Sequence, residues 1–177
     1  MKTFNKLFLL LFSLVVISSC ENYTDNPIEY SPIFPVSGEW RCRITDVATG
    51  NLVVTGTATT VYSFATYNTS DNSSTEMWIR TTTNIGGGLG TLRGKVSCDV
   101  PNLTFSAAAT TRDISHTSAT FSITDAKITR EAISMPSGVK ADKISFTYTT
   151  SKVPGSTFLI EGFRQTLWEE DLTFNTF

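Results

Sequence analysis

Residues 38–45 read Gly-Glu-Trp-Arg-Cys-Arg-Ile-Thr, and their alternation decides the fold. Trp40, Cys42 and Ile44 share one parity, while charged and polar side chains hold the other. A period of two is typical of a β-strand that buries one face and exposes the other. The stretch therefore predicts a half-buried first strand that begins shortly after Pro35.

The same period continues along most of the chain after this strand. Apolar residues of one parity predict further strands near 54–64, 76–83, 92–100, 103–107, 121–123, 128–133, 144–148 and 157–165. Between them lie turns at 49–51, 101–102, 124–126, 135–138 and 154–155, a glycine-rich hairpin at 84–90, and polar loops at 68–75 and 110–118. Strands joined so tightly must pair antiparallel.

Eight or nine short strands without helical periodicity predict an all-β domain over residues 36–177. An antiparallel up-and-down barrel of about eight strands is favoured, because closure of the sheet removes its exposed edges. A two-sheet sandwich is the alternative. The acidic and aromatic segment after Gln165 is expected to be peripheral.

The N-terminal residues have the pattern of a bacterial export signal. Lys2 and Lys6 precede an apolar stretch at 7–16, which is too short to cross a hydrocarbon core of about 30 Å. The stretch ends in Ile17-Ser18-Ser19-Cys20, which resembles the lipobox of lipoproteins. We therefore expect residues 1–19 to be a signal peptide and Cys20 to be lipidated, since Ile17 fits an ordinary cleavage site poorly.

Residues 20–35 are polar and rich in proline after the cysteine, which predicts a tether between lipid and domain. The alternative is that Ile33 and Phe34 pack on the barrel. The expected location is the bacterial cell envelope, on the outer membrane. The sequence gives no indication of the oligomeric state.

Composition narrows the range of partners. The formal net charge is −2 and no basic cluster stands out along the chain, which argues against a nucleic-acid partner.

Cys42 and Cys98 fall on the apolar parity of predicted strands, so they either pair across the interior or remain thiols. Thiols are favoured, because a disulfide needs Cα atoms within about 7 Å.

A Gly-x-Trp motif at Gly38 and Trp40 opens the first strand, and Arg164 lies in the last. This pattern resembles the calycin and lipocalin arrangement, in which the indole closes one end of the barrel and a basic side chain covers its face. The resemblance implies that Gly38, Trp40 and Arg164 form a barrel-closing group.

A wider resemblance runs through most of residues 36–171. Its elements are Val36-Ser37-Gly38-Glu39-Trp40, Met77-Trp78-Ile79, the segments 102–106, 123–127 and 136–144, and Gly162-Phe163-Arg164-Gln165-Thr166 followed by the acidic residues 169–171. In this order they resemble the Bacteroidales lipoproteins called the lipid-binding putative hydrolase family, which are lipocalin-like barrels. The hairpin 84–90 departs from the pattern, since glycines stand where an aromatic rim residue is expected.

The word hydrolase in that name finds no support among the residues. No Gly-x-Ser-x-Gly elbow occurs, and the single histidine, His116, lies in a polar loop. Glu39, Asp99 and Glu161 take the parity opposite to the interior, and the run 169–171 is typical of a solvated face. We therefore expect a protein that is not an enzyme and that has no cofactor and no metal.

The interior of a barrel of this size is either filled by side chains or open to one small ligand. Each case implies a different function. The first is binding of a small hydrophobic or lipid-like ligand by the interior residues Cys42, Val54, Tyr62, Phe64, Phe105, Phe146 and Phe158. The second is a filled barrel that acts as a structural or interaction subunit and docks a protein or glycan through its outer face or the loops 68–75 and 110–118. A hydrolase that uses His116 is the remote third.

Overall fold

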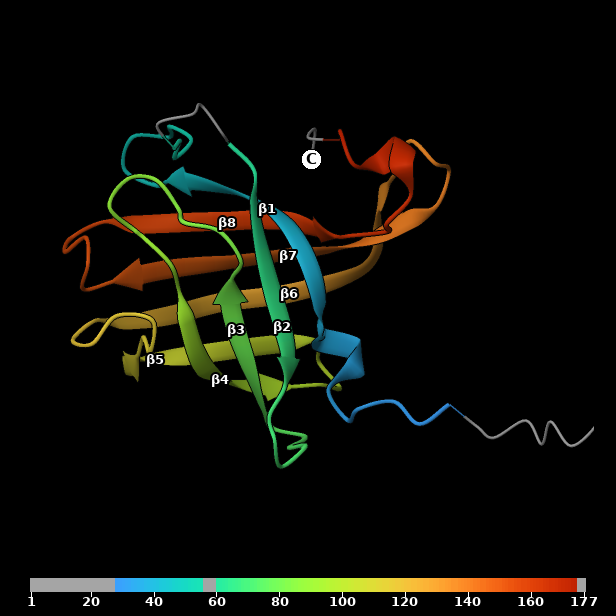
Figure 1. Ribbon diagram of the computed structural model, residues 1–177, viewed down its shortest axis with the longest axis horizontal. Helices are drawn as coiled ribbons and strands as arrows, with labels where there is room; N and C mark the ends of the chain where they lie inside the picture. The colour runs from blue at the N-terminus through green and yellow to red at the C-terminus, as the bar shows by residue number, and fades with distance from the viewer. Residues whose placement is uncertain (1–27, 56–59, 175–177) are drawn as a thin grey trace, which may run out of the picture. The chain divides into compact units, whose positions relative to one another are not determined.

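Eight antiparallel strands form a closed barrel in chain order in the computed structural model, which describes residues 28–55 and 60–174 (Figure 1). Strand β8 pairs with β1 and closes the sheet. The strands are β1 (Gly38–Asp46), β2 (Tyr62–Asn68), β3 (Glu76–Thr81), β4 (Arg93–Asp99), β5 (Thr104–Arg112), β6 (Thr120–Ser134), β7 (Lys140–Thr150) and β8 (Thr157–Arg164). The predicted up-and-down barrel is confirmed.

Strand β2 begins later than its alternation predicts. Residues after β1 turn back along its edge, where Leu52 bridges Thr45 and the Val53 amide donates to the Ile44 carbonyl at 2.8 Å. This return directs Val53 inward and leaves Val54 half exposed. The predicted interior position of Val54 is therefore wrong, because its parity belongs to the return segment and not to β2.

Strand β6 is a single strand where two were predicted. A turn was expected at 124–126, but the pairing with β7 continues on both sides of it. The register shifts by one residue between Thr124 and Lys127, and Asp125 has a positive φ of 54°. This β-bulge takes up the break in alternation, so that Ile123 and Ile128 are both buried.

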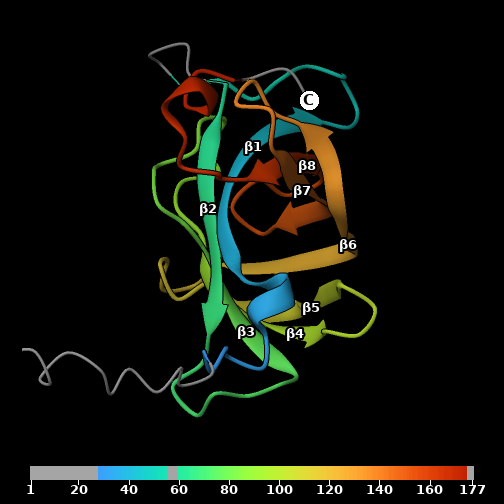
Figure 2. The same ribbon diagram turned by 90° about the vertical axis from the view of Figure 1, so that its right-hand side faces the viewer.

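The chain meets the barrel before β1, through the short 3-10 helix η2 (Phe34–Val36), which Figure 2 shows beside the start of that strand. Ile33 and Val36 are fully buried, and the compact unit starts at Ser31. Of the two residues that the alternative named, Ile33 is thus buried against the barrel, whereas Phe34 is 44% exposed. Residues 1–27, including the predicted signal peptide and Cys20, lie outside the described residues. Within the described ranges, no helix has the length and apolar character needed to cross a membrane.

Candidate functional site

One end of the barrel interior is closed by Trp40, which is fully buried. Its indole Nε1 donates to Thr66 Oγ1 at 2.9 Å, and that hydroxyl donates to the Val36 carbonyl at 2.8 Å. The Arg164 guanidinium carbon lies 4.8 Å from the centre of the Trp40 ring. The two residues are direct partners in the β1–β8 register, so the closed sheet itself brings them together.

Arg164 also binds the chain that enters the barrel. Its Nη2 donates to the Pro35 carbonyl at 3.0 Å, and its Nη1 donates to the Ser37 carbonyl. A Cβ atom on Gly38 would lie 3.2 Å from Nη1, so a larger residue in the Gly-x-Trp motif would crowd the guanidinium. The structure thus places all three predicted closing residues in one group.

Asp142 is the member of this group that sequence reasoning missed. Its Oδ2 lies 3.2 Å from Arg164 Nε, and its Oδ1 accepts the Glu131 amide at 2.9 Å. Burial lowers the pKa of Arg164 and the Asp142 charge opposes that shift. The sequence does contain a signal for this role, because Asp142 has the same parity as Ile144 and Phe146, which are predicted to face the interior. A carboxylate buried there needs a cation as partner.

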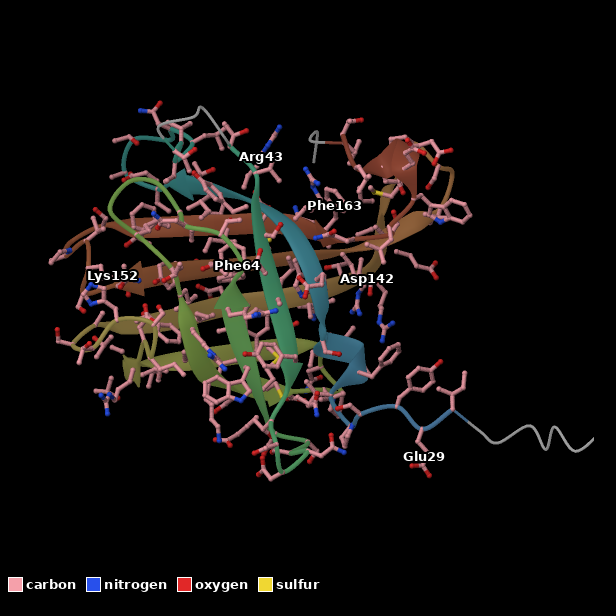
Figure 3. The ribbon with its side chains drawn as sticks, in the orientation of Figure 1. Glu29, Arg43, Phe64, Asp142, Lys152 and Phe163 are labelled. Carbon is pink, nitrogen blue, oxygen red and sulfur yellow. The ribbon has the colours of Figure 1, made fainter. Side chains whose placement is uncertain are left out.

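A layer of aromatic rings fills the middle of the barrel around Phe146. The ring centres of Phe64 and Phe105 lie 6.0 and 5.4 Å from that of Phe146, both in edge-on geometry. Phe64, which lies on β2, is labelled in Figure 3. Val54 is the exception among the seven predicted lining residues. The other six are buried in this interior: Cys42, Tyr62, Phe64, Phe105, Phe146 and Phe158.

The other end of the barrel is covered by an aliphatic cap, which we define as Val53, Ile85, Leu89 and Leu92. All four belong to the same buried cluster as the aromatic layer. A Cβ atom on Gly86 would lie 1.9 Å from the Val54 carbonyl oxygen, so only glycine lets the hairpin lie on this backbone. The Tyr62 hydroxyl donates to the Val53 carbonyl at 3.0 Å and joins the cap to β2.

The loops around the cap are joined by a buried ion pair that sequence reasoning also missed. Lys152 Nζ lies 2.7 Å from Asp113 Oδ2, with only 7% and 0% of the two side chains exposed. Lys152 also donates to the Thr91 carbonyl at 2.6 Å, while Ser115 Oγ and the Arg93 amide donate to Asp113 Oδ1. Lys152 and Asp142 mark opposite ends of the barrel in Figure 3.

The thiols lack the features of a nucleophile. Cys42 and Cys98 are free, as the thiol alternative predicted. Burial raises the pKa of Cys42 far above its ordinary value, and burial together with Asp99 and Glu76 raises that of Cys98. A reactive cysteine requires the opposite shift, because the thiolate is the attacking species.

The remaining polar candidates either are exposed to solvent or form structural hydrogen bonds. His116 is exposed in the loop after β5, and Glu169 and Glu170 are exposed as expected. Asp171 is not a solvated residue: it accepts the Ser137 amide at 2.9 Å, the Ser137 hydroxyl at 2.8 Å and the Thr166 hydroxyl. It holds the C-terminal segment on the β6–β7 turn, where Phe174 contacts Phe163. In the described part of the chain, no three His, Cys, Asp or Glu side chains are grouped as metal ligands.

A family model described as lipid-binding putative hydrolase matches residues 25–169, which include all eight strands. No curated protein matches this chain.

Proposed function

Since this chain belongs to the lipid-binding putative hydrolase family, we propose that its barrel binds a small hydrophobic, lipid-like ligand. The observation that carries the proposal is an apolar interior between the aromatic layer and the aliphatic cap. Such an interior suits an acyl chain.

The interior side chains contact one another, so a ligand must displace some of them. The cap is the segment that can move at lowest cost, because Ile85 and Leu89 belong to a short glycine-rich hairpin. Exposing two aliphatic side chains costs about 3–6 kcal/mol, whereas burying an acyl chain contributes about 0.8 kcal/mol per methylene. A chain of roughly ten methylenes therefore offsets the displacement.

Binding without catalysis is part of the proposal. The exposed position of His116, the high pKa values of both thiols and the structural use of Asp113, Asp142 and Asp171 support it. Loss of turnover of an ester substrate on His116→Ala would overturn this part.

Attachment to the outer membrane through lipid on Cys20 is the second part, supported by the lipobox-like sequence at 17–20. Mass spectrometry of membrane-extracted protein should give an N-terminal cysteine that carries acyl chains. A Cys20→Ala variant that remains on the membrane would contradict it.

A filled barrel that acts as an interaction subunit is the second candidate. The direct ring contacts of Phe146 with Phe64 and Phe105 favour it, since they leave no gap between these side chains.

Displacement of a fluorescent fatty-acid analogue separates the two candidates. We expect saturable binding, faster association for Leu89→Ala in the cap, and no change for Val54→Ala, which lies at the same end but is exposed. Absence of saturable binding by all three proteins would favour the filled barrel.

A further inference from the structure

A row of side chains crosses the outer face of four neighbouring strands. Glu39 on β1 pairs with Ala65 on β2, Ala65 pairs with Arg80 on β3, and Arg80 pairs with Arg93 on β4. The alternate residues of these strands, such as Trp40, Phe64 and Ile79, point into the barrel. The register therefore collects one carboxylate and two guanidinium groups on the outer surface.

The row borders an open groove of about 510 Å³, whose lining also includes Ser37, Tyr67 and Asn68. Ala65 lies among the lining residues but is only 2% exposed, so the longer side chains around it cover its methyl group. A volume of this size lies within the range of about 300–1,000 Å³ of small-molecule sites. The charged residues of the row project from the outer face of the sheet, opposite to the barrel interior, whereas Gly38 and Thr66, which also line the groove, adjoin the group that closes the barrel.

Aromatic rings hold the cations of this face in place. The Arg80 guanidinium lies 5.5 Å from the centre of the Tyr67 ring, and Arg93 lies 5.6 Å from that of Trp78. Lys95 Nζ contacts the same indole at 5.7 Å and lies 3.7 Å from Glu76. A guanidinium held against a ring presents its planar fork with less loss of side-chain entropy on binding.

Arg80 and Arg93 are direct cross-strand partners, and like charges in such a position destabilise a sheet. Among the described residues, neither arginine lies within ion-pair distance of a carboxylate, whereas Lys95 does. A bound carboxylate between the two forks would compensate the repulsion and accept bidentate hydrogen bonds.

Glu39 at the other side of the groove determines what else the ligand must carry. Its carboxylate repels a second anionic group but accepts hydrogen bonds from hydroxyl groups. A ligand with one carboxylate and several hydroxyls supplies an anion for the two arginines and hydrogen-bond donors for Glu39, whereas clustered phosphates supply the anion but are repelled by Glu39. We propose that this outer groove over β1–β4 binds a uronic-acid residue of an acidic oligosaccharide, with its carboxylate on Arg80 and Arg93 and its hydroxyls toward Glu39.

Calorimetric titration of the folded protein with an acidic trisaccharide of two galactose residues and one galacturonic-acid residue tests the proposal. We expect binding of the acidic trisaccharide, no binding of neutral galactotriose or inorganic phosphate, and a roughly tenfold loss of affinity for Arg80→Gln or Arg93→Gln. Lys140→Gln is the matched control, since it removes one exposed charge from β7, which does not line the groove. Thermal melting verifies that each variant is folded.

Glu39→Gln distinguishes the sugar from an anionic membrane surface. It should weaken binding of the acidic trisaccharide, because a charged acceptor of the hydroxyls is lost. Attachment to phosphatidylglycerol vesicles that Glu39→Gln strengthens would assign the groove to lipid phosphates and overturn the proposal. Absence of trisaccharide binding at millimolar concentration, or an equal loss for Lys140→Gln, would also overturn it. Fatty-acid displacement should be unchanged in Arg80→Gln, so the groove and the interior are tested separately.

Discussion

Arg164 joins the entering chain, β7 and the core through a single side chain. Its contacts with the Pro35 carbonyl, Asp142 and the Trp40 ring use the donors and the flat face of one guanidinium. A lysine ammonium cannot make these contacts at once, because it lacks the planar fork. The closing group therefore depends on arginine specifically.

Arg164→Ala should lower the free energy of unfolding by about 2–4 kcal/mol, because it leaves the mostly buried Asp142 carboxylate without its nearest cation. Urea unfolding followed by tryptophan fluorescence measures the change. Arg130→Ala is the control: that side chain is half exposed and lies 3.9 Å from the same carboxylate, so its removal should cost about 1 kcal/mol or less. Equal losses in the two variants would refute the role given to Arg164.

Asp113 should make the free energy of unfolding depend on pH. Burial raises the pKa of this carboxyl, but hydrogen bonds from Lys152, Ser115 and the amides of Arg93 and Ser115 outweigh it and hold the pKa below its ordinary value. A group with a lowered folded-state pKa stabilises the fold above its unfolded pKa of about 3.9 and loses that contribution as the pH falls through the folded value.

Asp113→Asn should therefore be less stable than the natural protein at pH 7, and the difference should shrink below about pH 4. Urea unfolding of both proteins between pH 7 and pH 2.5 measures it. A difference that stays constant over this range would show that the charge of Asp113 has no part in joining the loops.

At the scale of the elements, alternation predicted most of the strands, because one side of every strand faces the same core. Alternation gave a wrong prediction at two places where the strand pairing changes, the return segment before β2 and the Asp125 bulge in β6. Neither change of pairing is marked by a change in the local amino-acid composition. The outer groove was equally hidden. No basic run marks it in the sequence, and only the register of β3 with β4 brings Arg80 beside Arg93.

The hairpin 84–90 is the element on which the cap depends. Gly86→Ala should destabilise the protein by about 1–3 kcal/mol, because its Cβ would lie 1.9 Å from the Val54 carbonyl oxygen and force the hairpin away. It should also speed release of a bound fatty-acid analogue. Unchanged release rates in Gly86→Ala would show that the hairpin does not control access.

At the scale of the molecule, the barrel of residues 31–174 has an interior closed by the Trp40–Arg164 group at one end and by the aliphatic cap at the other. The two ends differ in strength. Both ends have an ion pair, Arg164–Asp142 at the first and Lys152–Asp113 in the loops around the cap, but only the first adds a cation–π contact, whereas the cap itself is aliphatic and rests on a glycine-rich hairpin. A ligand that enters should therefore do so through the cap, and the outer face of β1–β4 stays available to a second partner.

Native mass spectrometry of the protein purified under mild conditions from the cells that produce it tests the central claim most directly. The account predicts a non-covalently bound molecule of lipid-like mass in addition to any acyl chains on Cys20. Collisional activation should release it, and the variant Val96→Phe, which enlarges a buried side chain, should reduce its occupancy. A single ligand-free species in both proteins, before and after incubation with fatty acids, would contradict lipid binding in the barrel.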